Sequence, residues 1–222
     1  MLQFFSKYKS FGIVLFILSA IIISIIYTIL KPNRTLQIFE PANVSTELVD
    51  STVQHIRKFH KIKDFSLLNQ NGQKVTQEDY KDKIYVADFF FTTCQTICPM
   101  MTDHMKKIQD ELEDDKEVLL LSHTVIPETD KVPQLKKYAV EKGVDDTKWN
   151  LVTGDKKQIY ELARKSYLVV KTDGDGGPYD MIHTENFVLV DKEKRIRGFY
   201  DGTKMEEIER LLEDIEVLKQ SR

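Results

Sequence analysis

The first hydrophobic segment of this chain is continuous. Residues 11–30, FGIVLFILSAIIISIIYTIL, contain no charged side chain. About twenty apolar residues form a helix long enough to cross a bilayer. A cleaved signal peptide has a shorter apolar core, of about 7 to 15 residues, and small residues at its cleavage site. Here Lys31-Pro32-Asn33-Arg34 follows instead. We therefore expect an uncleaved transmembrane anchor at residues 11–30, after a short cytoplasmic leader at residues 1–10.

The orientation of this anchor follows from what flanks it. Its positive flanks, Lys7 and Lys9 before and Lys31 and Arg34 after, are nearly balanced, so the positive-inside rule decides little. A short leader ahead of a large domain favours an N-terminus on the cytoplasmic side. Residues 31–60 contain two prolines and little apolar periodicity, which indicates a tether. Residues 61–222 are then a domain outside the cytoplasm.

From residue 61 the pattern becomes that of a mixed domain. Residues 61–67 alternate, and Asn71-Gly72 supplies the turn of an N-terminal hairpin that continues at residues 74–76. Residues 84–91 are almost uniformly apolar, as expected for a central strand covered on both faces. Pro99 suits the first position of a helix, which apolar residues at helical spacing extend to about residue 113.

The second half repeats the alternation of strands and helices. We expect a buried strand at residues 117–125, helices at 132–142 (ending at Gly143) and 158–169, a glycine-rich loop at 172–180, a strand pair at 186–191 and 195–200, and a closing helix at 204–219. This order predicts an α/β, thioredoxin-like (redoxin) sandwich in one domain, preceded by one N-terminal transmembrane helix.

The net charge of the chain excludes one class of binding partner. The chain has 32 basic and 35 acidic residues, a formal net charge of -3. From Lys31 onward the balance is -5, because Lys7 and Lys9 precede that point. A nucleic-acid binder that works by bulk positive charge is therefore excluded.

The candidate chemistry lies at the two cysteines of the chain, Cys94 and Cys98, between a buried strand and a helix start. A helix N-terminus favours thiolate over thiol and lowers the pKa of a sulfur there. Metal ligation and disulfide exchange both need that thiolate, and the spacing permits either. A structural disulfide is the weaker interpretation, because closing so short a loop constrains the unfolded chain little.

A third ligand would distinguish a metal site from a purely redox pair, and the chain has five histidines. We expect solvated side chains for His55 and His60 in or next to the tether. His104 is expected at the surface of the helix after Cys98, and His123 in the core or at the end of its strand. His183 is the candidate ligand, because it follows the glycine-rich loop and opens the last strand pair.

Four further residues are secondary candidates for a role near the metal site. Asp88, six residues before Cys94, and Asp180, three before His183, are candidates for orienting the ligands. A buried structural hydrogen bond for Asp88 and a solvent contact for Asp180 are the alternatives. Met100 and Met101 offer soft thioethers next to the cysteines, although we favour a core position for Met101.

These motifs carry a family resemblance. DFFFTTCQTICPMM at residues 88–101, HTVIPETD at 123–130, IHTENFVLVD at 182–191 and GFYDGT at 198–203 resemble the SCO/SenC family of membrane-anchored copper proteins. The resemblance implies that Cys94, Cys98 and His183 bind one copper ion, as Cu(I) or Cu(II), for the dinuclear copper site of cytochrome c oxidase. Thiolate sulfur suits Cu(I), and imidazole suits either oxidation state.

Two functions stay open. The first is a copper metallochaperone, with the oxidase subunit that carries the dinuclear copper site as its partner and a thioredoxin-like reductant as a further one. The second is a thiol-disulfide oxidoreductase that uses the Cys94/Cys98 pair to reduce an exported protein. Three intervening residues, where the thioredoxin motif has two, favour copper. The expected location is the bacterial inner membrane, single-pass, with the domain on the periplasmic side.

Overall fold

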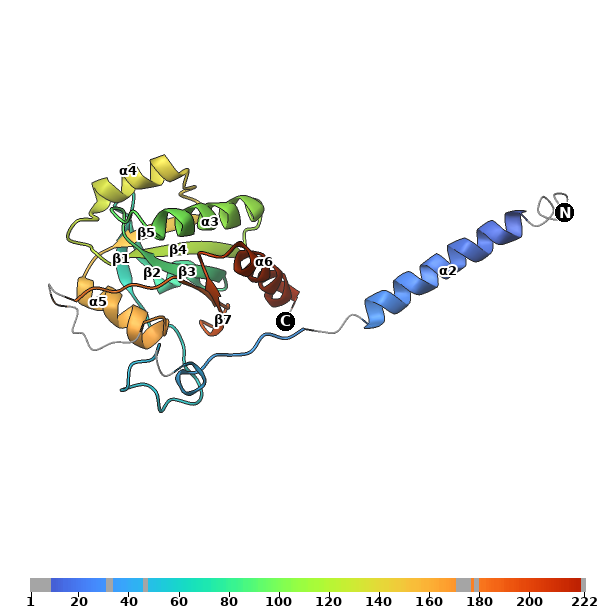
Figure 1. The fold of residues 1–222 in the computed structure, drawn as a ribbon, viewed down its shortest axis with the longest axis horizontal. Coiled ribbons are helices and arrows are strands. Elements are labelled where there is room, and N and C mark those ends of the chain that lie inside the picture. The colour runs from blue at the N-terminus through green and yellow to red at the C-terminus, as the bar shows by residue number, and fades with distance from the viewer. Residues whose placement is uncertain (1–8, 31–33, 46–47, 171–176, 178–179, 221–222) are drawn as a thin grey trace. The chain divides into compact units, whose positions relative to one another are not determined.

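The computed structural model describes residues 9–30, 34–45, 48–170, 177 and 180–220, with only the backbone at residues 9, 10 and 24–30. The chain divides into two compact units, Met1–Thr35 and Leu36–Arg222. Helix α2 (Lys9–Leu30) belongs to the first unit (Figure 1). A search of the described residues finds no helix with the length and apolar character needed to cross a membrane. The transmembrane anchor therefore stays a prediction from the sequence.

The second unit is built on one seven-stranded sheet with the order β2-β1-β5-β4-β3-β6-β7. The strands are β1 (Ser66–Asn69), β2 (Lys74–Thr76), β3 (Ile84–Phe90), β4 (Val118–Thr124), β5 (Trp149–Thr153), β6 (Asn186–Val190) and β7 (Ile196–Asp201). The central strands β3, β4 and β5 are parallel, whereas β6 and β1 flank them in the antiparallel sense. The carboxyl ends of β3 and β4 therefore share one edge of the sheet.

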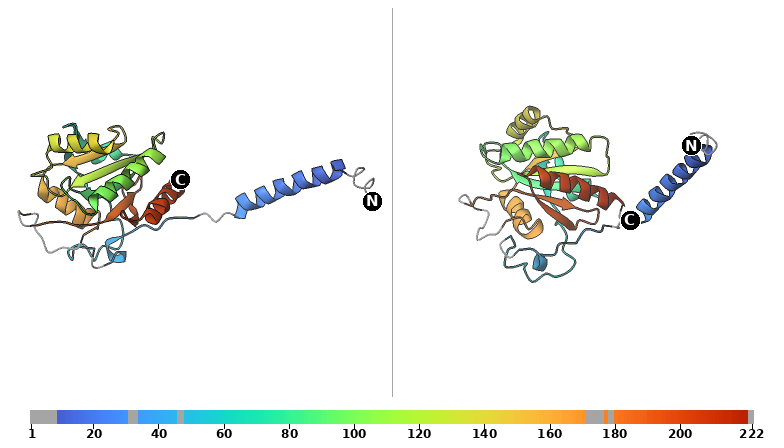
Figure 2. Two further views of the ribbon diagram at one scale, coloured as in Figure 1. Left: turned by 45° about the horizontal axis from the view of Figure 1, so that its top comes forward. Right: turned by 45° about the vertical axis from the view of Figure 1, so that its right-hand side comes forward.

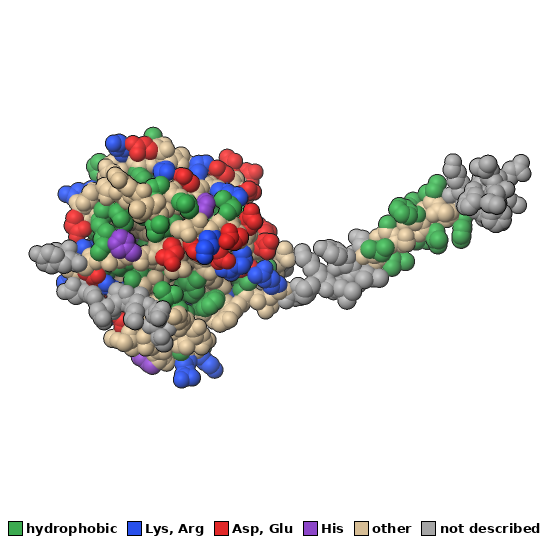
Figure 3. Space-filling model, in the orientation of Figure 1, with side chains coloured by type: hydrophobic (Ala, Val, Ile, Leu, Met, Phe, Trp, Pro, Cys, Tyr) green, Lys and Arg blue, Asp and Glu red, His purple; other side chains and the backbone are tan. Residues whose placement is uncertain are grey.

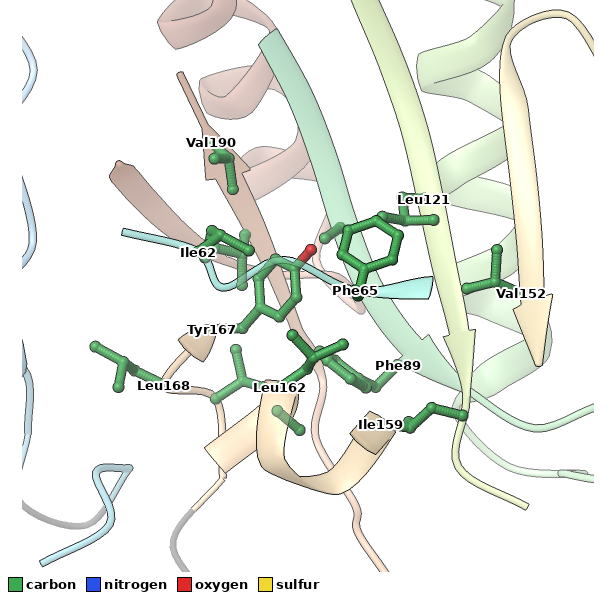
Figure 4. Close-up of a cluster of buried hydrophobic side chains, with 14 of the residues drawn as sticks. Ile62, Phe65, Phe89, Leu121, Val152, Ile159, Leu162, Tyr167, Leu168 and Val190 are labelled. Carbon is green, nitrogen blue, oxygen red and sulfur yellow. The ribbon is translucent and has the colours of Figure 1, made fainter. Parts of the chain in front are cut away.

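Helices cover both faces of this sheet (Figures 1 and 2). One face carries α3 (Cys98–Glu111), α4 (Val132–Lys142) and α6 (Met205–Gln220), which form one hydrophobic cluster with strand residues such as Val86 and Leu120. The other face carries α5 (Lys156–Glu161) and the π-helical turn η3 (Leu162–Ser166). Figure 4 shows Phe65, Leu121 and Tyr167 in this second cluster. Alternate strand residues serve the two faces, as the side-chain period of a strand requires.

Most predicted elements are confirmed within one or two residues, except that the first strand of the hairpin, expected from residue 61, begins at Ser66. The hairpin β1/β2, the buried strands β3 and β4, and helices α3, α4 and α6 all form, and Gly143 ends α4 with a φ of 67°. The helix expected at residues 158–169 instead begins at Lys156 and changes to a π-helical turn at Leu162. Most of the glycine-rich loop at 172–180 lies outside the described residues.

One strand was missed by the sequence analysis. Strand β5 lies between β4 and β1, where it pairs in parallel with β4 through Leu120 and Trp149. Its five residues, WNLVT, are too short to show a clear period. Long-range pairing with its two neighbours decides its conformation.

The interpretation of residues 31–60 as a tether is wrong from Leu36 onward. Phe39 N donates to Ile196 O at 2.9 Å, and Ala42 N donates to Ile56 O at 3.0 Å. Residues Pro41–Asn43 form a short 3-10 helix, and Val49 is buried in the cluster around α5 with 1% exposed. Scattered apolar residues without a helical or strand period are sufficient to dock this segment, so periodicity could not reveal it.

Candidate metal and thiol site

The cysteine loop connects the carboxyl end of β3 to the first turn of α3, and a buried carboxylate fixes its start. Asp130, which is fully buried, accepts hydrogen bonds from Thr92 N at 3.0 Å and Thr92 Oγ1 at 2.6 Å. The same carboxylate accepts from Thr124 Oγ1 at the end of β4, at 2.6 Å. Asp130 therefore ties the loop after β3 to the neighbouring strand. Sequence reasoning missed this role, although Asp130 stands in one of the motifs that carry the resemblance.

Both cysteines are free thiols in unequal environments. Cys98 is the first residue of α3 and is 4% exposed, whereas Cys94 is half-buried in the loop. Burial, and then a hydrogen bond with Cys94, raise the pKa of the Cys98 thiol to about 12. Partial burial also opposes ionisation of Cys94, but hydrogen bonds with Thr96 and Cys98 outweigh it and lower the pKa of Cys94 to about 7.

This asymmetry corrects one expectation from the sequence. The helix N-terminus was expected to lower the pKa of the sulfur that lies there, which is Cys98. Instead the pKa of Cys98 rises, because desolvation of a buried thiolate costs more than the partial charge of a helix end returns. Cys94 is therefore the thiol prepared to ionise near neutral pH.

Asp88 lies on β3 below α3, with 2% exposed. Burial raises the pKa of its carboxyl to about 7, against a hydrogen bond with Ser122 that lowers it. Its Oδ1 has no hydrogen-bond partner among the described residues, and its charge raises the pKa of Cys98. Asp88 is therefore a buried carboxyl whose negative charge disfavours ionisation of Cys98.

His183 lies at the same edge of the sheet as the cysteines. Strand β6 runs antiparallel to β3, so the residues just before Asn186 lie beside the carboxyl end of β3. The His183 ring is exposed and meets the Phe91 ring edge-on, with 6.0 Å between centroids. Phe91 O in turn accepts a hydrogen bond from Cys94 N at 3.3 Å. One aromatic residue therefore lies between the candidate imidazole and the cysteine loop.

The three candidate ligands lie near one another but do not form a metal-binding arrangement in the structure. Among the described residues, no group of three or more His, Cys, Asp or Glu side chains is arranged to hold a metal ion. The donor set itself, two thiols and one imidazole, has the chemistry that copper prefers.

The segment that carries His183 is held by a buried ion pair. Asp180 Oδ1 accepts a hydrogen bond from Arg164 Nη2 at 2.6 Å, and the two side chains are 9% and 4% exposed. Tyr160 Oη, from the preceding helix α5, donates to Asp180 O at 3.1 Å. The solvent contact expected for Asp180 is therefore wrong. Arg164 was missed, because nothing in the sequence marks it as the partner.

Of the other four histidines, three make contacts within the domain. His55 is exposed, as expected, but His60 is buried, with its Nε2 2.7 Å from Ser166 O. His104 is half-buried, with its Nδ1 2.7 Å from Gly202 O, rather than at the open surface. His123 is in the core as expected, stacked on Phe89 at 4.8 Å, and burial lowers the pKa of its imidazole to about 4.

The two methionines next to the cysteines differ in burial, as the sequence suggested. Met101 is fully buried in the cluster under α3, which confirms its core position. Met100 is 48% exposed. Of these two methionines, Met100 is therefore the one whose side chain is accessible next to the cysteines.

A seven-stranded thioredoxin-like sheet with a free thiol pair at the edge between β3 and α3 defines a redox or soft-metal domain. The family model "SCO1/SenC" matches residues 53–220, and the chain belongs to this family. The expectation drawn from the sequence motifs is confirmed, and with it the thioredoxin-like fold.

Relatives and solved structures agree with this assignment. The chain is 34% identical over 160 residues to the "SCO1 protein homolog" of Bacillus subtilis, covering 70% of this chain and 81% of the relative. It resembles the structure of BsSco, a member of the Sco family of cytochrome c oxidase assembly proteins in which a disulfide switch was identified, with a TM-score of 0.63, 31% identity and coverage of 73% and 95%. It also resembles copper-bound ScoI of Arabidopsis thaliana, with a TM-score of 0.57, 26% identity and coverage of 71% and 98%.

Proposed function

We propose that this protein binds one copper ion through Cys94, Cys98 and His183 and delivers it as cargo to the dinuclear copper site of cytochrome c oxidase. The observation that carries the proposal is the free thiol pair at the β3 edge, with an exposed imidazole one aromatic ring away. Relatives that bind copper, and others that assemble cytochrome c oxidase, support it.

The unequal thiols suit a cargo site. Cys94 is half-buried and ionises near neutral pH, so it is the sulfur that meets an incoming ion first. Cys98 is buried and protonated at that pH, so its proton leaves when the metal binds. The imidazole of His183 would then add the nitrogen ligand to the bound ion. Loss of this nitrogen ligand would allow the ion to leave. An exposed third ligand is suited to transfer, because a partner can compete for the ion from that side.

We also propose the membrane location that the sequence indicates. Residues 11–30 would anchor the chain in the bacterial inner membrane, with the domain on the periplasmic side. The oxidase subunit with the dinuclear copper site would be the partner there. A thioredoxin-like reductant would keep the cysteines reduced, since exported thiols tend to oxidise.

The test is titration of the reduced protein with Cu(I) and Cu(II), with metal content and optical spectra as readouts. We expect one copper per chain. His183→Ala should weaken Cu(II) binding by about tenfold or more, because losing even an outer partner that only orients a ligand typically costs 10–100-fold in metal affinity, and His183 is proposed as a ligand itself. His55→Ala, an exposed histidine remote in sequence from the site, is the matched control and should leave binding unchanged. Unchanged Cu(II) affinity in His183→Ala would contradict the ligand assignment.

The second candidate, a thiol-disulfide oxidoreductase, is favoured by the lowered pKa of Cys94. In this reaction the Cys94 thiolate attacks a partner disulfide, Cys98 then displaces the partner sulfur, and the partner leaves with two thiols while Cys94 and Cys98 form a disulfide. The two functions separate on His183. Complete reduction of a model disulfide to two thiols should be abolished by either Cys→Ser change and unaffected by His183→Ala, whereas copper binding requires all three residues. Cys94→Ser should not react, and Cys98→Ser should stop at the mixed disulfide with Cys94.

A further inference from the structure

The segment at residues 57–63, RKFHKIK, presents positive charge to solvent in a domain that is acidic overall. From Phe59 onward its residues alternate between exposed and buried, with His60 and Ile62 buried at 7% and 2% exposed. The basic side chains of the segment are all exposed: Arg57, Lys58, Lys61 and Lys63. We call these four residues together with Phe59 the basic-aromatic segment.

The charges of this segment are not neutralised locally. None of its four basic side chains forms a hydrogen bond or an ion pair with another described residue. The neighbouring Asp64 is paired with Lys194, at 2.8 Å. Elsewhere the visible face of the domain mixes acidic and basic side chains closely (Figure 3). The basic-aromatic segment is therefore a positively charged region in a domain whose net charge is negative.

Phe59 is exposed in an unusual way. Its side chain is 89% exposed, and its backbone lies in the left-handed region with a φ of 68°. A bulky residue there is strained and persists only when its surroundings hold it. The Glu40 carboxylate stabilises this conformation, because it accepts hydrogen bonds from Phe59 N at 3.1 Å and from His60 N at 2.9 Å. The structure thus fixes an aromatic side chain pointing away from the domain.

This segment lies where the chain enters the domain. Phe39 N donates to Ile196 O at 2.9 Å, and Ile62 N donates to Lys194 O at 2.8 Å. Both ends of residues 39–62 are therefore attached to the same β6–β7 turn. The proposed anchor ends at Leu30, six positions before Leu36, where the second unit begins.

We propose that the basic-aromatic segment docks on an anionic membrane surface. Lys and Arg side chains attract anionic headgroups, and aromatic side chains partition into the membrane interface. The segment would orient the domain relative to the bilayer, with Phe59 in the headgroup region. This inference rests in part on the proposed anchor, but its test does not use the anchor.

The test uses residues 36–222, which contain both hydrophobic clusters and all seven strands and so fold without the first unit. Flotation with vesicles of equal parts phosphatidylglycerol and phosphatidylcholine should recover the protein at low ionic strength. Vesicles of phosphatidylcholine alone should not. Added salt should reduce the bound fraction, since exposed charges are screened.

Two variants make the test specific to this segment. Lys58→Gln with Lys61→Gln should lower the membrane partition about thirtyfold, from the typical attraction of each basic residue near an anionic surface. Lys74→Gln with Lys137→Gln removes the same charge from exposed positions elsewhere and should retain nearly full binding. Phe59→Asn should also weaken binding without lowering the thermal midpoint, because Asn tolerates a left-handed backbone.

The outcomes are decisive. Absence of binding to anionic vesicles, equal binding to neutral vesicles, or equal losses in the two double variants would overturn the proposal. An acidic protein segment would then be the better occupant. Failure of copper binding by Cys94, Cys98 and His183 would leave the vesicle result in place. Recovery of the full chain free of membranes would contradict the anchor but not this surface.

Discussion

Arg164 and Asp180 form a buried ion pair that joins η3 to the segment leading to His183. Arg164 Nη2 donates to Asp180 Oδ1 at 2.6 Å, and the side chains are 4% and 9% exposed. The guanidinium also lies over the Tyr160 ring, at 5.3 Å. Because His183 follows Asp180 by three residues, this contact fixes one end of the segment that carries the exposed imidazole.

The first prediction concerns the stability of this ion pair. Asp180→Asn removes the negative charge that pairs with the buried Arg164 guanidinium and should lower the free energy of unfolding by about 3 kcal/mol. Urea denaturation measures this. The matched control is Glu141→Gln, which breaks the exposed pair between Glu141 and Lys137. Exposed pairs contribute little, so the control should cost less than about 0.5 kcal/mol. Equal small losses in the two variants would contradict the prediction.

The second prediction concerns the reactivity of the two thiols. The pKa of Cys94 is lowered to about 7, and that of Cys98 is raised to about 12. Only thiolates are alkylated at an appreciable rate. In the reduced, metal-free protein, iodoacetamide should therefore modify Cys94 first, with a rate that rises as the pH increases through about 7. Mass spectrometry of peptides gives the site.

Cys→Ser variants control for which sulfur is observed. Cys98→Ser keeps a hydroxyl beside Cys94 and should retain fast alkylation near neutral pH. Cys94→Ser leaves only the buried thiol and should react slowly up to high pH. Faster modification of Cys98 would show that its burial is lost in solution.

The third prediction concerns the dependence of stability on pH. Burial lowers the pKa of His123 to about 4, from 6.5, so the unfolded chain binds a proton first as the pH falls. His123 therefore costs stability progressively between pH 6.5 and 4. Burial raises the pKa of Asp88 to about 7, from 3.8, so the folded chain binds that proton first. Asp88 therefore adds stability as the pH falls from 7 to 4, and the two effects oppose each other.

Single variants separate these opposing effects. Asp88→Asn leaves His123 uncompensated, so its free energy of unfolding should fall by up to about 3 kcal/mol between pH 6.5 and 4. His123→Phe preserves an aromatic ring beside Phe89 and leaves Asp88 uncompensated, so its stability should rise over the same range. Parallel pH profiles for both variants and the unmodified protein would contradict the assignment.

The fourth prediction tests whether residues 36–60 belong to the domain. Val49→Ala removes two carbon atoms from a residue that is 1% exposed and should cost about 2 kcal/mol. Val140→Ala makes the same chemical change at a residue that is 70% exposed and should cost less than about 0.5 kcal/mol. Thermal or urea unfolding measures both. Equal effects would mean that the segment is a free tether after all.

Several elements of this protein follow from local sequence. Strand β3 is a continuous apolar run, α4 ends at a glycine in the left-handed region, and the cysteines lie between a strand and a proline-initiated helix. These signals act over a few residues and do not depend on distant parts of the chain. The cysteine segment is also one of the motifs that carry the family resemblance, so the α/β thioredoxin-like fold and the candidate site residues could be predicted together.

The remaining features depend on contacts between segments that are far apart in sequence. Strand β5 forms because β4 and β1 flank it, and Val49 is buried because residues 36–60 dock on the sheet. Arg164 becomes a partner of Asp180 only when η3 meets the His183 segment. The raised pKa of Cys98 is likewise a consequence of burial, which overrides the local effect of the helix end.

The sequence by itself thus determined the candidates for the sulfur and nitrogen donors, because their chemistry and spacing are present in local motifs. Only the tertiary structure decided which thiol ionises first, what holds the His183 segment, and where Phe59 and its basic neighbours point. Desolvation, long-range pairing and side-chain exposure are properties of the packed chain, and no local pattern of residues encodes them.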